Sequence, residues 1–348
     1  MKKALREDKQ TWFNKLTRRL FDAVYDVRVK LHEKIHKKDN LQKKEKGIAQ
    51  RKVNNLIFYC ILMAWPVIQF CIFYIGVNLN SVLMAFQTYN SNTFKFEWYG
   101  FKNFEVVFND IATNASIAEY FMNSMLYFGV GILSTVLALL FSYYIFKKMA
   151  GYKFFRLVLY IPSIISPIVI AIIFMHFIEK VVPGYLWLWT GSKYPTMDTE
   201  SQKRFWLIFY NLLLSFGVNV LMYSSSMSSI DDSVIESAQL DGAKPIREFF
   251  SIVLPLIYPT VATFLAVSIA GIFTNQYNLF SLYGDSAPSE LQNLGYFLYL
   301  KTYFAVVEGS MESAFVIPAT WGLVFTLVAA PITLFARWAL NKFGPSTN

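Results

Sequence analysis

The stretch of sequence that decides the fold runs from residue 230 to residue 259 and reads IDDSVIESAQLDGAKPIREFFSIVLPLIYP. Ser233 is followed three residues later by Glu236, a capping-box pattern in which each side chain satisfies a free amide at the start of a helix. Gly242 provides a stop, because glycine tolerates the left-handed backbone that commonly ends a helix. Pro245 opens a second helix, since its missing N–H is harmless in a first turn. The pattern predicts two short helices around a glycine bend.

Long apolar stretches lie on both sides of this segment. A helix needs about 20 mostly apolar residues to cross the roughly 30 Å of hydrocarbon in a bilayer. The stretches that meet this requirement are 56–77, 122–146, 155–178, 205–227, 257–283 and 314–336. Prolines inside them are compatible with helices, because neighbours in a bundle can satisfy the freed carbonyls. We therefore expect an all-α, polytopic membrane protein with six transmembrane helices.

The composition supports lipid as the solvent. Apolar residues make up 55% of the 348 residues and charged residues only 16%, whereas a soluble domain carries about 25% charged residues. The two cysteines, Cys60 and Cys71, lie eleven residues apart in the first apolar stretch. That spacing is about 16 Å along a helix, which is too far for a disulfide.

The distribution of positive charge predicts the orientation. With the N-terminus inside, 25 of the 32 Lys and Arg residues fall on the inner side, as the positive-inside rule requires. Both termini are then cytoplasmic, and the segment 230–256 lies at the inner surface. A rigid bent segment there can transmit a push from a partner, although Glu236 could also serve only as a helix cap in an ordered loop.

Three parts follow from these patterns: a basic cytoplasmic extension over 1–53, a six-helix transmembrane domain over 54–342 that includes the loop 230–256, and a tail over 343–348. Most of the basic residues behind the net charge of +9 lie in the extension. Its apolar residues recur at helical spacing, namely Trp12, Phe13, Leu16, Leu20, Val24, Val27 and Leu31. This predicts an amphipathic helix on the anionic inner leaflet, with a solvated helix packed on a partner as the alternative. Basic residues beside apolar spans also explain the charge better than nucleic-acid binding does.

The sequence offers little enzymatic chemistry. It contains no Gly-Lys dipeptide, so a phosphate-binding loop with its lysine is absent. Its three histidines are not arranged as metal ligands. The spans are nearly free of the ionisable residues that proton-coupled transporters place within the membrane. The energy for any transport must then come from outside the bilayer.

Uncharged polar residues do recur within two of the spans. In the fourth span they share one helix face, and in the fifth they follow a similar spacing. The predicted stripes are Asn211, Ser215, Asn219 and Tyr223, and then Ser268, Gly271, Asn275 and Asn278, with Gln276 beside them. One interpretation is a path through the membrane whose side chains hydrogen-bond a polar solute in passing. The alternative is hydrogen bonding between helices of the bundle.

The segment 230–259 resembles the signature loop of permease subunits in bacterial ATP-binding-cassette importers. That signature is E-A-A, three residues, G, nine residues, I, one residue, L-P. The matching residues here are Glu236, Ser237, Ala238, Gly242, Ile252, Leu254 and Pro255, with Ser237 in place of an alanine. Tyr99-Gly100-Phe101-Lys102-Asn103-Phe104 and Asn123-Ser124 are also similar to family segments. The resemblance covers about residues 55–340 and is greatest to MalF-like carbohydrate permeases. One departure is Gly284-Asp285-Ser286-Ala287-Pro288, where many relatives have a Gly-Gly-Pro run.

The resemblance implies a type I importer fold and a set of partners. These are a second, different permease subunit, two ATPase subunits that carry Mg-ATP, and an extracytoplasmic substrate-binding protein, all at the cytoplasmic membrane of a bacterium. This chain would bind no cofactor and hydrolyse no ATP. The residues expected to contact the ATPase are Glu236, Ser237, Ala238, Asp241, Gly242, Ala243 and Arg247. The implied cargo is a carbohydrate, with an oligosaccharide preferred, and the two polar stripes would then face the translocation path and hydrogen-bond sugar hydroxyls. Alternatives are glycerol-phosphate, a peptide or another small solute, and more remotely a membrane scaffold or enzyme.

Overall fold

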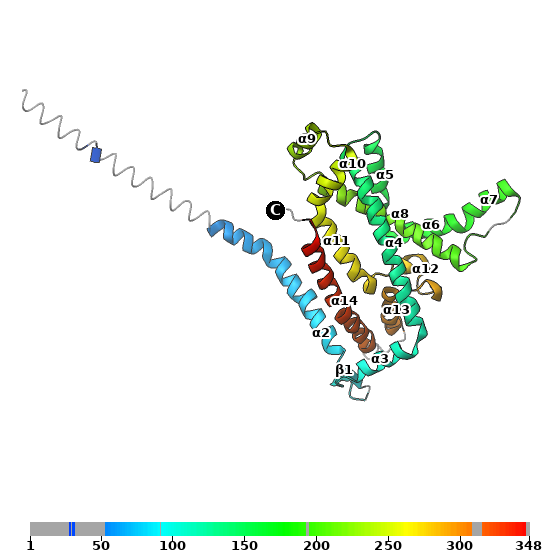
Figure 1. The fold of residues 1–348 in the computed structure, drawn as a ribbon. Coiled ribbons are helices and arrows are strands. Elements are labelled where there is room, and N and C mark those ends of the chain that lie inside the picture. Colours follow the sequence, from blue (N-terminus) through cyan, green and yellow to red (C-terminus); the bar gives the residue numbers. More distant parts are fainter. Residues whose placement is uncertain are drawn as a thin grey trace, which may run out of the picture. The chain divides into compact units, whose positions relative to one another are not determined.

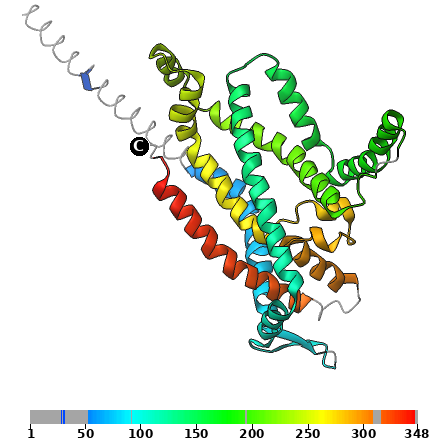
Figure 2. The ribbon, with the colours of Figure 1, turned by 45° about the vertical axis from the view of Figure 1, so that its right-hand side comes forward.

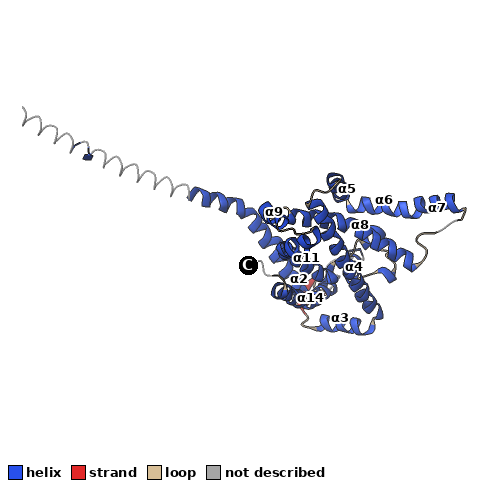
Figure 3. Ribbon diagram, turned by 45° about the horizontal axis from the view of Figure 1, so that its top comes forward, coloured by secondary structure: helices blue, strands red, loops and turns tan. Residues whose placement is uncertain are grey.

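The computed structural model describes residues 28, 30–31, 53–90, 92–192, 195–307 and 315–345. The prediction for the extension over 1–53 therefore lies almost entirely outside the described residues. The chain divides into two units, residues 1–79 and 80–348. Figure 3 shows that the described residues are almost entirely helical.

The first unit contains the whole of the first predicted span, 56–77. A continuous helical stretch runs over Val53–Met84, and its end includes a π-helical segment at Phe70–Gly76 and α2 at Val77–Met84. The described side chains from 53 to 79 are exposed, as expected for an apolar helix that is covered by lipid or by another membrane protein. Cys60 and Cys71 are free thiols, as their spacing predicted.

The second unit holds the other five long apolar helices. They are α4 (Ala115–Phe146), the stretch Pro167–Thr190, α8 (Glu200–Met227), the stretch Pro245–Thr274 and α14 (Val316–Phe343). With the helix over Val53–Met84, six helices in the described part of the chain are long and apolar enough to cross a membrane. The predicted number of spans is therefore confirmed.

The third predicted span, 155–178, has the wrong boundaries. The structure has α5 (Tyr152–Ile164) as a separate helix, and the span that follows joins α6 (Pro167–His176), a π-helical segment (Phe177–Val181) and α7 (Val182–Thr190). The break falls at Ile165 and Ser166, whose ψ angles are 142° and 131°. Pro167 explains it, because proline disfavours the helical conformation in the residue before it.

The fifth predicted span, 257–283, also ends too late. The helix α11 (Leu254–Thr274) stops where Asn275 turns extended, and a short helix α12 (Leu279–Tyr283) follows. The Asn275 side-chain oxygen accepts a hydrogen bond from the Tyr277 amide at 2.8 Å, a local turn that asparagine favours over helix. Tyr277 and Asn278 then adopt positive φ angles of 54° and 57°, so the chain reverses before α13 (Leu294–Val307).

A small hairpin is the one feature of the described residues that an all-α prediction missed. The strands β1 (Gln87–Asn90) and β2 (Lys95–Trp98) pair in antiparallel register, with Gln87 opposite Trp98. The helix α3 (Lys102–Thr113) follows. The buried Asn103 amide donates to the carbonyls of Ala85 and Gln87 at 2.9 and 2.8 Å, so it fixes α3 against the hairpin.

The short elements of the second unit lie at two opposite ends of the bundle that its long helices form. Figure 1 shows α9 (Asp232–Leu240) and α10 (Pro245–Glu248) at one end, and α3 with β1 at the other. The helices α11 and α14 run side by side (Figure 2), and the Tyr258 hydroxyl donates to the Leu340 carbonyl at 2.8 Å. The C-terminal end of α14 therefore lies near the end of the bundle that holds α9.

Close helix packing forms the centre of the second unit. The Ser142 hydroxyl of α4 donates to the Val220 carbonyl of α8 at 2.9 Å. On another side of α8, Gly217 allows close contact with α5, since a Cβ at that position would lie 2.5 Å from the Leu159 carbonyl oxygen. A side chain at Gly217 would thus push α5 and α8 apart. The buried core of this region is aliphatic and aromatic, with Val220, Tyr223 and Phe249 among its members.

Candidate functional site: an elbow and a polar cavity

The elbow, residues 230–256, begins with a helix whose cap differs from the predicted one. The helix α9 spans Asp232–Leu240, and the Asp231 carboxylate accepts a hydrogen bond from the Ser233 amide at 2.9 Å. The capping box of Ser233 and Glu236 is therefore wrong, because a carboxylate two residues earlier already satisfies the helix start. That hydrogen bond from the Ser233 amide also holds the pKa of the Asp231 carboxyl below its usual value.

The predicted glycine bend is confirmed. Gly242 has a φ of 77°, and its amide bonds the Gln239 carbonyl at 3.0 Å while the Ala243 amide bonds the Ala238 carbonyl at 3.0 Å. This pair of bonds is the Schellman ending of a helix. A residue with a side chain at Gly242 would be strained even though the space around it is open.

The second helix of the elbow begins at Pro245 as predicted, but it is not a separate short helix. The helix α10 passes through a π-helical segment at Phe249–Val253 directly into α11. The whole stretch Pro245–Thr274 is therefore one helical rod. A displacement at its elbow end is passed along α11 without an intervening loop.

The predicted coupling residues differ in exposure. Glu236, Ser237, Asp241, Gly242 and Arg247 are exposed, Ala243 is half-buried and Ala238 is buried. The sequence analysis missed three apolar side chains of the elbow: Leu240, Ile246 and Phe250 are 89%, 75% and 57% exposed. Beside the exposed polar residues of the elbow, these side chains are candidates for contact with a partner protein or with lipid.

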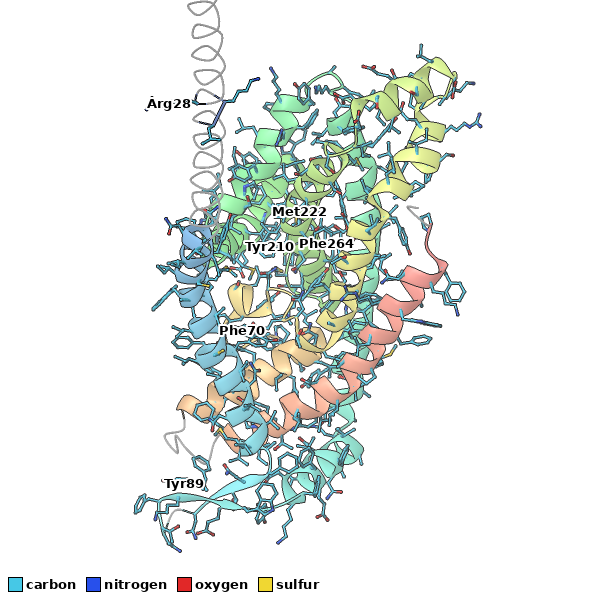
Figure 4. The ribbon with its side chains drawn as sticks, turned by 90° about the vertical axis from the view of Figure 1, so that its left-hand side faces the viewer. Arg28, Phe70, Tyr89, Tyr210, Met222 and Phe264 are labelled. Carbon is cyan, nitrogen blue, oxygen red and sulfur yellow. The ribbon has the colours of Figure 1, made fainter. Side chains whose placement is uncertain are left out.

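A polar cavity of about 700 Å³ lies among α4, α8, α11 and the segment 275–293. Most of the predicted path residues line it, namely Asn211, Ser215, Asn219, Tyr223, Ser268, Gly271, Asn275 and Asn278. Gln276 is not among the lining residues. In Figure 4, Tyr210 and Met222 mark α8 and Phe264 marks α11 beside it.

One wall of the cavity was missed at the sequence level. The helix α4 contributes Ser124, Tyr127, Gly131, Ser134 and Thr135. These residues recur at steps of three and four, so the same helical spacing that revealed the other stripes could have found them. Small hydroxyl residues are easily overlooked because they often bond their own helix, as Thr135 does to the Gly131 carbonyl at 3.0 Å.

The amides in the cavity wall divide into two kinds. Asn211 is buried, donates to the carbonyls of Leu207 and Tyr277, and accepts from the Asn278 amide at 2.7 Å. Asn211 therefore holds the segment after α11 in place, which is the role of interhelical bonding. The Asn219 amide has no hydrogen-bond partner among the described residues, which leaves it available to a solute.

The wall of the cavity carries no charge. All of its lining residues are uncharged, and they combine hydroxyls and amides with aromatic rings. The rings of Tyr127 and Tyr277 stack at 4.3 Å. Among the described residues, no group of three or more His, Cys, Asp or Glu side chains could hold a metal ion.

Comparison with known proteins identifies the family of this chain. The family of binding-protein-dependent transport system inner membrane components matches residues 132–347. That match covers more than half of the chain, so the chain belongs to this family. It is a multi-pass permease subunit of an ATP-binding-cassette importer.

The relatives differ in their cargo. The sn-glycerol-3-phosphate transport system permease protein UgpA of Yersinia pestis bv. Antiqua (strain Antiqua) is 25% identical over 246 residues, which are 70% of this chain and 82% of that protein. A bacterial ABC transporter that imports the acidic polysaccharide alginate has a chain with a TM-score of 0.66 at 21% identity, covering 83% of this chain and 96% of that one. A second structure, in which the alginate transporter is bound to an alginate-loaded periplasmic protein, gives a TM-score of 0.64 at 21% identity, covering 82% and 94%. The two structures support the fold.

Proposed function

We propose that this chain forms half of the translocation path of an importer for an uncharged carbohydrate. The observation that carries the proposal is the cavity wall, which offers hydroxyls, amides and aromatic rings without a charged side chain. Sugar hydroxyls both donate and accept hydrogen bonds, so amides such as that of Asn219 suit them. Aromatic rings such as that of Phe264, which is half-buried in the cavity wall, provide apolar surface for the faces of a sugar ring.

Glycerol-phosphate transport is the second candidate, because the Yersinia relative is named for it. A phosphate carries negative charge and is usually held by arginine or lysine. The cavity wall contributed by this chain has neither residue, so the uncharged solute fits it better. A competition experiment separates the two: a neutral oligosaccharide should reduce uptake of the labelled solute, and glycerol-phosphate should not.

In this proposal the ATP is hydrolysed by separate subunits. Two ATPase subunits with bound Mg-ATP dock on the elbows of this chain and of a second permease subunit. A solute-binding protein delivers the carbohydrate from the outer side of a bacterial cytoplasmic membrane. Both termini then lie in the cytoplasm, in line with the distribution of Lys and Arg.

The docking is tested by co-purification with a glycine variant. Gly242→Val places a β-branched side chain at a φ of 77°, which should distort the bend and reduce the captured ATPase at least tenfold. The control is Gly191→Val, at a φ of 67°, since this glycine ends α7 and not the elbow. If both variants are expressed at the wild-type level and capture equal amounts of the ATPase, docking through the elbow is refuted.

The path is tested by uptake into proteoliposomes. Asn219→Leu and Asn275→Leu should each lower the rate of uptake at least fivefold, because both residues line the cavity. Thr263→Val is the matched control, since Thr263 is an exposed polar residue of α11 that bonds its own helix at the Pro259 carbonyl. Unchanged uptake in both asparagine variants would remove these residues from the path.

A further inference from the structure

A buried carboxylate lies at the centre of the elbow. Glu248 is 1% exposed. Its two oxygens lie 2.9 and 3.1 Å from the Lys147 ammonium nitrogen, and the Tyr143 hydroxyl donates to the carboxylate at 3.0 Å. The Gln239 side-chain amide approaches the second oxygen at 3.5 Å. We refer to these four residues as the Glu248 cluster.

The Glu248 cluster joins three elements that carry different parts of the function. Gln239 belongs to α9 and Glu248 to α10, while Tyr143 and Lys147 lie at the end of α4. The helix α9 carries the exposed Glu236. The rod that begins with α10 lines the cavity through α11, and α4 lines it from another side. Through one carboxylate, the exposed surface of the elbow is thus tied to two walls of the cavity.

The surroundings of the carboxylate are apolar. Ile235 of α9 and Phe249 beside Glu248 are buried in the same cluster as Ile145 of α4. The ring of Phe249 packs on that of Tyr143 at 5.1 Å. Apolar side chains of similar volume could hold helices together equally well, and a buried charge is tolerated only while its partners stay in place. An ion pair at this position therefore favours one arrangement of the three elements over others.

On the basis of the proposed function, we propose that Glu248 and Lys147 are positioning residues that couple movement of the ATPase to movement of the cavity walls. They make α9, α4 and the rod over Pro245–Thr274 move as one body when an ATPase displaces the elbow. Without the ion pair, α9 can follow the ATPase while α4 stays behind. Hydrolysis of ATP would then continue without a proportional movement of the cavity walls.

The test measures coupling and not only assembly. Each variant is reconstituted with its ATPase, its partner permease and its binding protein, and solute imported per ATP hydrolysed is measured. Glu248→Gln keeps the volume and one acceptor oxygen but removes the charge, and Lys147→Met removes the cation. Each should lower the solute imported per ATP at least fivefold, while the complex still assembles with its ATPase. The double variant Lys147→Glu/Glu248→Lys should recover at least half of the wild-type ratio.

A matched control is the ion pair of Lys301 and Asp110, at 3.8 Å and partly exposed in another part of the bundle. Lys301→Gln should leave the ratio unchanged. Three results would overturn the proposal: wild-type coupling in both single variants, uptake and hydrolysis that fall together in proportion to assembled complex, or no recovery in the swapped pair. Failure of the proposed function looks different, because the wild-type chain itself would then import no solute and capture no ATPase.

Discussion

The two ends of the helical bundle are held together by different chemistry. At the elbow, the side chains of Glu248 and Lys147 form an ion pair at 2.9 Å. At the end of the bundle away from the elbow, the amide of Asn123 donates to the backbone carbonyls of Glu290 and Gln292 at 3.0 and 2.8 Å. The guanidinium of Arg204 bonds the Asn123 oxygen at 2.7 Å and the same Glu290 carbonyl at 2.8 Å. The elbow depends on a buried pair of charges. The other end depends on bonds to the backbone of a loop, beside the partly exposed ion pair of Arg204 and Glu200 at 2.7 Å.

The loop after the fifth span, at the end away from the elbow, is held mainly through its backbone. Its segment Gly284-Asp285-Ser286-Ala287-Pro288 departs from the Gly-Gly-Pro run that the family resemblance implies. The following residues are held through backbone atoms, including the Leu291 carbonyl, which accepts from the Tyr127 hydroxyl at 2.8 Å. Changes of side chain in such a loop leave its anchoring bonds intact.

The largest effect on stability is expected at the elbow. Lys147→Met leaves the Glu248 carboxylate buried without its cation, and loss of one partner from a buried pair costs about 3–5 kcal/mol. The Lys147 side chain is 23% exposed, so solvent reduces the expected loss to about 3 kcal/mol. Thermal unfolding of the purified chain in detergent measures it. A melting temperature equal to that of the wild type would break the contrast between the two ends.

A smaller effect is expected at Asn123. Asn123→Ala removes two donors from loop carbonyls and the acceptor of Arg204, and a buried group left unsatisfied costs about 1–3 kcal/mol. We expect about 2 kcal/mol and faster hydrogen exchange of the amides over 287–293. Ser289→Ala is the control, because Ser289 is exposed and its side chain bonds only that of its neighbour Glu290. Equal exchange in the two variants would mean that Asn123 does not hold the loop.

Substitutions within the loop itself should matter less. Asp285→Gly brings the segment closer to the usual family pattern, and Asp285 is exposed and bonds only Ser286 through its side chain. Surface changes of this kind are usually within about 0.5 kcal/mol. Uptake should stay within twofold of the wild type. A tenfold loss would show that the side chains of this loop, and not only its backbone, are needed.

The smallest effect is expected for the ion pair of Lys203 and Glu290. Its atoms are 3.7 Å apart and about a third exposed, and such pairs contribute about 0–1 kcal/mol. The pKa of the Glu290 carboxyl is lowered by a hydrogen bond from its own amide and by Lys203. Because the pKa of Glu290 is lowered on folding, its ionised carboxylate stabilises the folded state at neutral pH. This stabilisation is lost as the pH falls through the pKa of the folded state. Lys203→Gln should therefore change the melting temperature slightly at pH 7 and still less in acid, and a larger effect in acid would contradict this assignment.

The sequence was sufficient for features with strong local signals. Apolar length gave six spans, and Gly242 with Pro245 gave the bend and the second helix of the elbow. Helical spacing also identified two walls of the cavity, although it did not distinguish Asn211, which bonds its neighbours, from Asn219, which is free to bind a solute. That distinction depends on which backbone carbonyls the fold brings near each amide.

Features set by tertiary contacts could not be predicted in the same way. Glu248 looks like an ordinary charged residue of a short surface helix, and only the packing of α10 against α4 brings Lys147, which lies 101 residues away, to it. Pro167 and Asn275 mark the breaks that fall within the third and fifth predicted spans. Hydropathy alone does not reveal where these helices end, because the apolar composition continues across both positions.

Site-specific photo-crosslinking can show whether an ATPase subunit docks on the elbow. A photoreactive phenylalanine analogue is placed at Leu240, which is 89% exposed on the elbow, and in parallel at Phe94, which is 77% exposed beside the hairpin at the other end. Irradiation of the assembled transporter should join the ATPase to position 240 and not to position 94. An ATPase adduct at position 94, or none at position 240 in a complex that hydrolyses ATP, would mean that the ATPase does not dock on the elbow.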